Sequence, residues 1–229
     1  MPRYKTILFD ADNTLMDFTK SEREALTDTL QLMGITPGED LIATYSTIND
    51  AMWKKLERGE IEKNALRVAR FAEFAKHYGW QLDVEKMAFA YMDFLSQKTY
   101  LIDGALELCQ RLAAHCELYI ITNGLKFVQE RRFAATPLKP LFKDAFISEE
   151  MGAEKPNKAY FDEMARRIPD FSPKHALVVG DSLSSDIRGG ITAGIDTCWF
   201  NPKGAPAPAD LPITYVVKAL EEILPLVLD

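Results

Sequence analysis

The chain has 229 residues, 47% of them hydrophobic, which is enough for the packed core of one large domain or two modest ones. Its formal net charge of −7 argues against binding to a nucleic-acid polymer, because phosphate backbones are bound by basic stripes. No stretch approaches the ~20 apolar residues of a membrane helix, so no membrane association is expected. An acidic protein that handles phosphate must supply local positive charge from a lysine or a metal.

The start of the chain and its cysteines favour a cytoplasmic protein. The apolar run that follows the first five residues is too short for the core of a signal peptide. Cys109, Cys116 and Cys198 lie in apolar segments, and the sequence has no Cys-x-x-Cys pair and no Cys/His spacing typical of a metal site. We therefore expect three reduced, buried cysteines.

Five apolar, β-branched runs have the length of strands, and they lie at residues 6–9, 118–121, 145–147, 176–179 and 197–200. Their hydrophobicity is nearly continuous, which is typical of strands buried on both faces of a parallel sheet. Segments of helical period, such as 105–112, separate them. Strands that alternate with helices predict a doubly wound, Rossmann-like α/β fold.

The C-terminal part predicts one more helix. Leu220, Ile223 and Leu224 have helical spacing, and Pro225 is expected to end or kink the helix that they form. The proline-rich segment 201–212 is expected to link the last strand to this helix.

The interval after the first strand breaks the alternation. From residue 17 to 97 no convincing strand appears, and helical stripes follow one another between glycine-containing turns. About 80 residues far exceed the ~10 to 12 that a crossover between parallel strands requires. We therefore predict an all-helical cap domain at 17–97, inserted into a catalytic core formed by 1–16 and 98–229. The alternative is a set of extra helices packed on the flank of the core.

Polar residues capable of chemistry fall at or just after the carboxyl ends of the predicted strands. They are Asp10, Asp12, Thr122, Lys155, Asp181 and Asp186. In an open parallel sheet this edge is where ligands bind, so residues distant in sequence are expected to share one crevice. Four converging carboxylates would repel one another, and a hard divalent cation resolves this. Oxygen-only ligands without His or Cys favour Mg²⁺ over zinc.

Four segments in this order resemble the motifs of the haloacid dehalogenase superfamily. They are residues 7–15 with Asp10 and Asp12, 120–124 with Thr122, the Lys155-Pro156 pair, and 178–186 with Asp181 and Asp186. The resemblance covers essentially the whole chain, including a helical cap after the first motif. It implies a Rossmann-like core that uses Mg²⁺.

The resemblance also implies catalytic roles for the first motif. Asp10 would be the nucleophile that attacks phosphorus and forms an aspartyl-phosphate. Asp12 would protonate the leaving oxygen and then activate water, although an acidic residue there could instead be a turn residue bonded to its own backbone. Asn13 stands where many relatives have Gly, and Asn tolerates the left-handed backbone of that turn. Thr14 is either a plain turn residue or part of the same functional loop.

The remaining motifs imply the binding groups. Thr122 and the backbone N–H of Asn123 would hold the phosphoryl oxygens, and Lys155 would neutralise the phosphate and the nucleophile. The magnesium ligands would be the carboxylates of Asp10 and Asp181 with the backbone carbonyl of Asp12. Asp186 would lie behind these ligands and orient Lys155 or a metal-bound water.

The residue at position 12 also bears on the reaction. True haloacid dehalogenases lack an acid there, so phosphate ester hydrolysis is the better hypothesis. Segments 12–18, 121–129 and 146–157 resemble the pyrimidine 5′-nucleotidase subfamily, which implies a nucleoside 5′-monophosphate as substrate. The alternatives are a phosphatase for a sugar phosphate or phosphoglycolate and, more remotely, a non-catalytic regulator that binds a phosphorylated metabolite.

The predicted cap would choose the leaving group, because the core grips only the phosphoryl moiety. Phe18 is either a base-stacking residue or a buried aromatic. Arg67 and Arg70 could meet a phosphate or sugar, but single charges on a helix are more often solvated, and they are not assigned to the site. The protein is expected to be a monomer or a small homo-oligomer with a small phosphate ester as its partner.

Overall fold

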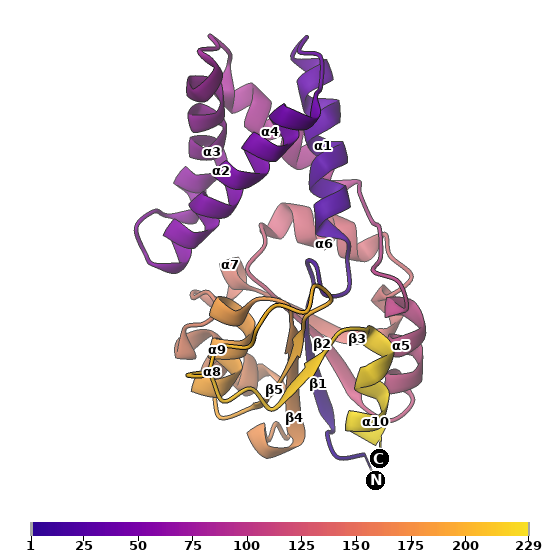
Figure 1. Ribbon diagram of the computed structural model, residues 1–229. Coiled ribbons are helices and arrows are strands. Elements are labelled where there is room, and N and C mark those ends of the chain that lie inside the picture. Colours follow the sequence, from indigo (N-terminus) through magenta and orange to yellow (C-terminus); the bar gives the residue numbers. More distant parts are fainter. Residues whose placement is uncertain (1, 229) are drawn as a thin grey trace. The chain divides into compact units, whose positions relative to one another are not determined.

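The computed structural model describes residues 2–228, which form two compact units (Figure 1). The core unit runs to Asp17 and resumes at Thr99, and the helical unit is Phe18–Lys98. These limits differ by one residue from the domain boundaries expected from the sequence. At the boundary the two connecting segments pair with each other, because Met16 forms an antiparallel bridge with Leu101 and the Asp17 N–H donates to the Tyr100 carbonyl at 3.0 Å.

The core unit is built on a parallel sheet, as the sequence predicts, but the sheet has six strands where five were expected. The strands are β1 (Thr6–Asp10), β2 (Glu117–Thr122), β3 (Phe142–Ile147), β4 (Ala176–Gly180), β5 (Asp196–Phe200) and β6 (Tyr215–Val217). Their order in the sheet is β3-β2-β1-β4-β5-β6, with every neighbouring pair parallel. The chain runs from β1 through β2 to β3 on one side, and it then crosses to the other side of β1 and continues with β4, so the order reverses at β1. Such a switch point opens a crevice at the carboxyl ends of the strands.

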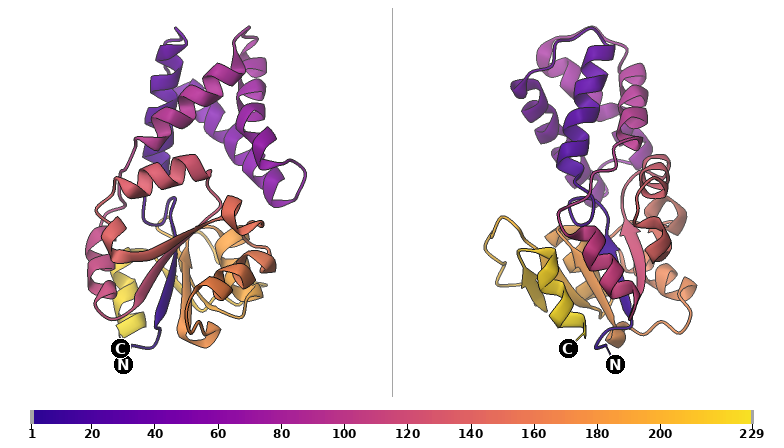
Figure 2. Two further views of the ribbon diagram at one scale, coloured as in Figure 1. Left: turned by 180° about the vertical axis from the view of Figure 1, so that it is seen from behind. Right: turned by 90° about the vertical axis from the view of Figure 1, so that its right-hand side faces the viewer.

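Helices cover both faces of this sheet. They are α5 (Ala105–Ala113), α6 (Lys126–Ala134), α7 (Ser148–Met151), α8 (Lys158–Arg167), α9 (Arg188–Thr192) and α10 (Ile223–Leu228), with short helices η1 (Lys139–Leu141), η2 (Pro173–His175), η3 (Leu183–Ile187) and η4 (Leu220–Glu222). Ile7 and Phe9 of β1 pack with α5 and α10, whereas Leu8 between them packs with α7 and α8. Figures 1 and 2 show α5 and α10 on one side of the sheet and α8 and α9 on the other.

One prediction for the C-terminal part is wrong, and of the two outcomes expected for Pro225 one is excluded. Segment 201–212 does not lead directly to the last helix, because β6 lies between them. This strand has only three residues at the sheet edge, and Val216 is exposed, so no apolar run marks it. Pro225 does not end the helix either, since α10 continues to Leu228. It lies in the first turn of α10, where an N–H has no partner within the helix, so its missing donor costs little.

The helical unit contains α1 (Phe18–Leu32), α2 (Glu39–Glu57), α3 (Lys63–Tyr78) and α4 (Val84–Ser96). Helix α1 packs against α4, α2 against α3, and α3 against α4. The aromatic rings of Tyr45, Phe71 and Tyr91 form its centre, with centroid distances of 5.0 to 5.4 Å. Gly79, with φ of 68°, ends α3 in the left-handed conformation that glycine adopts without a steric penalty. The unit therefore has a core of its own.

Cys109, Cys116 and Cys198 are free and buried, as predicted. Burial raises the pKa of the Cys109 and Cys198 thiols to about 12, which keeps both protonated and unreactive. Among the helices of residues 2–228, none combines the length and the apolar character needed to cross a membrane.

Candidate active site

The carboxyl ends of three adjacent strands bring the predicted site residues together. Strand β1 ends at Asp10, β2 ends at Thr122, and β4 ends one residue before Asp181. Because β1 lies between β2 and β4, these ends are neighbours in the sheet. Local sequence explains the placement, since each strand is a buried apolar run and the polar residue comes where the apolar run stops.

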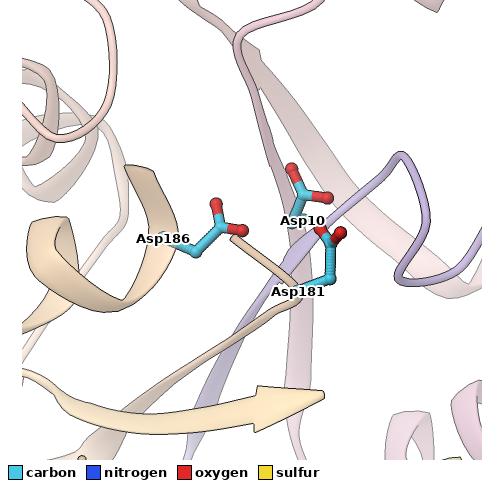
Figure 3. A group of neighbouring side chains, drawn as sticks. All are labelled: Asp10, Asp181 and Asp186. Carbon is cyan, nitrogen blue, oxygen red and sulfur yellow. The ribbon is translucent and has the colours of Figure 1, made fainter. Parts of the chain in front are cut away.

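Asp10, Asp181 and Asp186 form a carboxylate cluster. Each offers an oxygen, and these atoms all lie within 4.8 Å of one another. Figure 3 shows the three carboxylates pointing toward a common space. Asp10 is 7% exposed and Asp186 is completely buried. Three carboxylates at such a distance in a buried setting repel one another strongly, so positive charge must accompany them.

Lys155 supplies one positive charge to this cluster. Its Nζ donates to Asp10 Oδ1 at 2.8 Å, to Asp186 Oδ1 at 2.7 Å and to the Ile121 carbonyl at 2.8 Å. The side chain is 1% exposed, and these three acceptors satisfy all three ammonium hydrogens. One lysine against three carboxylates leaves two negative charges uncompensated. One divalent cation would balance them.

Burial and mutual repulsion perturb the titration of these groups. Burial and the charge of Asp186 raise the pKa of Asp10 well above its usual range, although Lys155 opposes them. Burial and Asp186 also raise the pKa of Asp181, to about 7. Burial alone would lower the pKa of Lys155, but the charges of Asp10 and Asp186 outweigh it and raise that pKa, so the lysine stays charged.

The donors in this cluster fit a hard divalent cation such as Mg²⁺. All are oxygens, and Asp10 and Asp181 follow neighbouring strands, whereas one Asp186 oxygen is already bonded to Lys155 and the other accepts from the Ser182 N–H at 3.1 Å. Both Asp10 oxygens also accept hydrogen bonds, from Lys155 and at a longer 3.2 Å from Thr14, but Asp10 is 7% exposed and Asp181 is half-buried, so these two carboxylates are more open to a metal than the completely buried Asp186. Asp186 is tied to the lysine.

Hydrogen bonds fix the loops that carry these residues. The Asn123 side chain donates to the Lys155 carbonyl at 2.8 Å and accepts from the Lys155 N–H at 2.9 Å, which joins the loop after β2 to the lysine. On β5, Trp199 Nε1 donates to the Asp181 carbonyl at 2.8 Å. Gly180 is required at the end of β4, because a Cβ there would lie 2.3 Å from the Asp186 carboxyl.

Asn13 and Thr14 shape the turn after β1, and the sequence alone did not decide whether Thr14 has a functional role. Asn13 has φ of 60°, the left-handed conformation expected of an Asn in that turn. Thr14 is completely buried, and its hydroxyl donates to Asp10 Oδ2 at 3.2 Å. Thr14 therefore contacts the predicted nucleophile and is more than a turn residue.

Asp12 is held by two residues of α6 to which the sequence assigned no role. Arg132 Nη1 donates to Asp12 Oδ1 at 2.5 Å, and Gln129 Nε2 donates to Asp12 Oδ2 at 2.5 Å. Gln129 also donates to Thr122 Oγ1 at 3.0 Å. The one available signal was their three-residue spacing, which places both on one face of the helix after the Thr122 motif. The neighbouring Arg131 made the choice of arginine ambiguous.

The helical unit contains a second buried polar group. Arg70 is 1% exposed, and its Nη1 donates to Asn49 Oδ1 at 2.9 Å, so the expectation that it is solvated is wrong. Glu22 accepts from Ser46 Oγ at 2.9 Å and from Asn49 Nδ2 at 2.8 Å. Phe18 and Arg67 are half-buried within the helical unit.

Comparisons with known proteins agree with this architecture. A family model described as haloacid dehalogenase-like hydrolase matches residues 4–194. HAD-hydrolase YfnB of Bacillus subtilis (strain 168) is 41% identical over 223 residues, which cover 97% of this chain and 95% of that protein. The crystal structure of YfnB bound to magnesium has a TM-score of 0.93 at 40% identity and covers 98% of both chains.

Two further relatives carry functional names. Pyrimidine 5′-nucleotidase PynA of Streptococcus pneumoniae is 36% identical and covers 96% of this chain and 94% of that protein. Pyrimidine 5′-nucleotidase YjjG of Escherichia coli is 31% identical, with 96% of each covered. The family match spans most of the chain, and these relatives align along nearly all of it. The chain is therefore a hydrolase that belongs to the haloacid dehalogenase-like hydrolase family.

Proposed function

We propose that this protein is a Mg²⁺-dependent phosphatase that hydrolyses nucleoside 5′-monophosphates, with a preference for pyrimidines, through an aspartyl-phosphate. The observation that carries the proposal is the cluster of Asp10, Asp181 and Asp186, in which Asp10 and Asp186 also pair with Lys155 Nζ. It combines a nucleophile, a fixed cation and an excess of two negative charges at the switch point of the sheet. Phosphoryl transfer needs this combination of positioning and electrostatic stabilisation.

In the first step, an Asp10 carboxylate oxygen attacks phosphorus and the bond to the leaving oxygen breaks. Asp12 gives that oxygen a proton, so the alcohol leaves neutral. In the second step, Asp12 takes a proton from water, the water oxygen attacks phosphorus, and the bond to Asp10 breaks. Inorganic phosphate leaves, and both carboxyl groups return to their starting states.

The remaining groups hold the phosphoryl oxygens. The Thr122 Oγ1 atom accepts from the Gly124 N–H and from Gln129 Nε2, both at 3.0 Å, so its own hydrogen can be donated to the substrate. Lys155 balances the charge of Asp10 and of the phosphate. Asp10, Asp181 and the Asp12 backbone carbonyl would hold Mg²⁺, which supplies further positive charge to the phosphoryl group when bound. Asp186 keeps Lys155 in place.

The substrate class rests on the relatives and on the motifs. PynA and YjjG are named pyrimidine 5′-nucleotidases, and the crystal structure of YfnB contains magnesium. Because the groups at the strand ends can grip only phosphate, we assign the choice of leaving group to residues 17–97 as a cap. We also propose that the protein works in the cytoplasm as a monomer or small homo-oligomer.

The nucleophile is tested by Asp10→Asn. We expect phosphate release to fall by at least about 1000-fold, because the amide is a very poor nucleophile, while the circular dichroism spectrum stays that of the wild type. Asp170→Asn, at an exposed position, is the matched control and should retain activity. An active Asp10→Asn variant would contradict the assigned nucleophile.

The substrate class is tested with a panel of phosphate monoesters assayed with Mg²⁺ and with chelator. We expect uridine, cytidine and thymidine 5′-monophosphates to be hydrolysed faster than purine nucleotides, and chelator to stop the reaction. A clear preference for sugar phosphates or phosphoglycolate would reject the nucleotide assignment. Binding without turnover of any substrate would favour the regulatory alternative.

A further inference from the structure

Gln129 and Arg132 of α6 both donate hydrogen bonds to Asp12, and we call this pair of side chains the α6 clamp. Each takes a different oxygen of the Asp12 carboxyl at 2.5 Å. Gln129 Oε1 accepts from Arg132 Nη1 at 3.4 Å, so the two clamp residues also contact each other. Through its bond to Thr122 Oγ1, Gln129 joins Asp12 to the hydroxyl that holds phosphate in the proposed function.

Burial indicates that the clamp is a built feature of the core unit. Arg132 is completely buried and Gln129 is 4% exposed, whereas the Asp12 side chain is 25% exposed. Burying a guanidinium is costly unless it is paired and hydrogen-bonded, and a leucine could fill the same helix face without that cost. Arg131, the residue before Arg132 in α6, is exposed. An arginine in this helix can therefore lie at the surface.

The geometry of the bonds suits a group that must transfer a proton in a fixed direction. Two donors on two different oxygens restrict the carboxyl in rotation as well as in position, which one contact cannot do. The Asp12 side chain is partly exposed at a turn, so packing alone restrains it less than it would restrain a core side chain. Holding such a group close to its reacting geometry is a recognised source of rate acceleration.

We propose that Gln129 and Arg132 are positioning residues that orient Asp12 for proton transfer to and from the leaving oxygen. This inference rests on the proposed phosphatase function and adds a role for α6. The clamp acts through Asp12 and does not itself touch the reacting atoms. Its loss therefore matters most where the leaving oxygen needs a proton.

The test compares two leaving groups. A nucleoside leaves as an alkoxide that needs a proton, whereas p-nitrophenolate leaves readily without one. In Arg132→Met we expect kcat for uridine 5′-monophosphate to fall by ~100-fold, the size typical of a lost acid–base contribution, with KM changed less than about threefold. The single-turnover release of p-nitrophenolate should fall by less than about fivefold.

A double-mutant cycle shows whether the effect passes through Asp12. In an Asp12→Asn background we expect Arg132→Met to lower kcat by no more than about twofold further, because the group that it positions is already lost. Arg132→Lys keeps one cationic donor and should recover part of the activity that the Met variant loses. Arg131→Met is the matched control on α6 and should behave as the wild type.

A second variant tests the same inference if Arg132→Met does not fold. A Cβ at position 124 would lie 2.2 Å from Gln129 Nε2, so Gly124→Ala displaces the glutamine without removing a charge. A pocket of about 280 Å³, bordered by Gln129, Thr122 and Phe133, can take the displaced side chain. Because Gln129 also donates to Thr122 Oγ1, both substrates should lose some activity, and we expect the loss in kcat for the nucleotide, ~10-fold, to exceed the loss for p-nitrophenolate release.

Equal losses for the two leaving groups, or multiplied losses in the Asp12→Asn background, would overturn the inference and leave the proposed function intact. If the wild type prefers another alkyl phosphate, that substrate replaces the nucleotide, because the inference concerns the proton and not the identity of the alcohol. If the wild type hydrolyses no phosphate ester, the proposed function and this inference both fail.

Discussion

At the scale of single residues, Lys155 is the buried cation that pairs with two carboxylates of the core unit. Its ammonium joins Asp10 after β1, Asp186 in η3 and the Ile121 carbonyl in β2. It is itself tied to the loop after β2 by Asn123. A buried lysine with three acceptors stabilises the folded chain only while both carboxylates face it, so its loss exposes their repulsion.

We expect Lys155→Met to lower the free energy of unfolding by roughly 3 kcal/mol in chelator, because it leaves Asp10 and Asp186 buried without their cation. Urea unfolding followed by tryptophan fluorescence measures this. Lys158→Met removes an exposed pair with Asp162 and should cost less than about 1 kcal/mol. A Lys155→Met variant as stable as this control would show that the carboxylates are not repelling one another.

The sequence was sufficient to predict Asp10, Thr122 and Asp181 as neighbours, because each follows an apolar run and parallel strands end at one edge. The contacts of Gln129 and Arg132 with Asp12 could not be predicted from the sequence. Arg132 and Arg131 are adjacent arginines, and only the position of α6 on the sheet decides which of them is buried. Long-range contacts of this kind are set by packing and not by local pattern.

At the scale of elements, α1, α2 and α3 meet around the buried Glu22. The strongest effect on this group is burial, which raises its pKa to about 7, although Ser46, Asn49 and Arg70 oppose that rise. Four helices were predictable from their apolar stripes and glycine turns. The polar centre was not, because Glu22 and Arg70 look like surface charges until the helices are packed.

The raised pKa of Glu22 makes the stability of the helical unit depend on pH. Its contribution is fully present below about pH 4.5, the unfolded value, and is lost as the pH rises through 7, because the folded state must then bury a charge. We expect the free energy of unfolding of the wild type, relative to Glu22→Gln, to fall by about 2 kcal/mol between pH 5 and pH 8. Urea unfolding at both pH values measures it.

Glu85→Gln, at an exposed position of α4, is the control and should keep the pH dependence of the wild type. The same pH dependence in Glu22→Gln as in the wild type would mean that Glu22 does not titrate with a raised pKa.

At the scale of the whole molecule, each unit has its own apolar core. Strand and helix residues form two clusters on the faces of the sheet, and Met52, Leu56 and Leu66 belong to a separate cluster in the helical unit. A ligand that binds Asp10 and Asp181 should therefore stabilise the core unit directly. The sequence predicted this division because a run of helices interrupts an alternating pattern of strands and helices.

We expect saturating Mg²⁺ to stabilise the core unit by about 3 kcal/mol at 100 times its dissociation constant, and chelator to remove the effect. Hydrogen exchange should slow in residues 180–187 and stay unchanged in 45–71 of the helical unit. Asp181→Asn should abolish the protection. Equal slowing in both segments would show that the metal acts on the protein as a whole and not through this cluster.

The paired connecting segments at Met16–Leu101 and Asp17–Tyr100 have a consequence for how such a chain can diversify. The entry and exit of the helical unit leave the sheet side by side, already joined by hydrogen bonds. An interchangeable segment with the same end-to-end spacing could be grafted between them without breaking a strand or moving Asp10. Selection can therefore exchange one module for another while the carboxylate cluster around Asp10 is inherited unchanged.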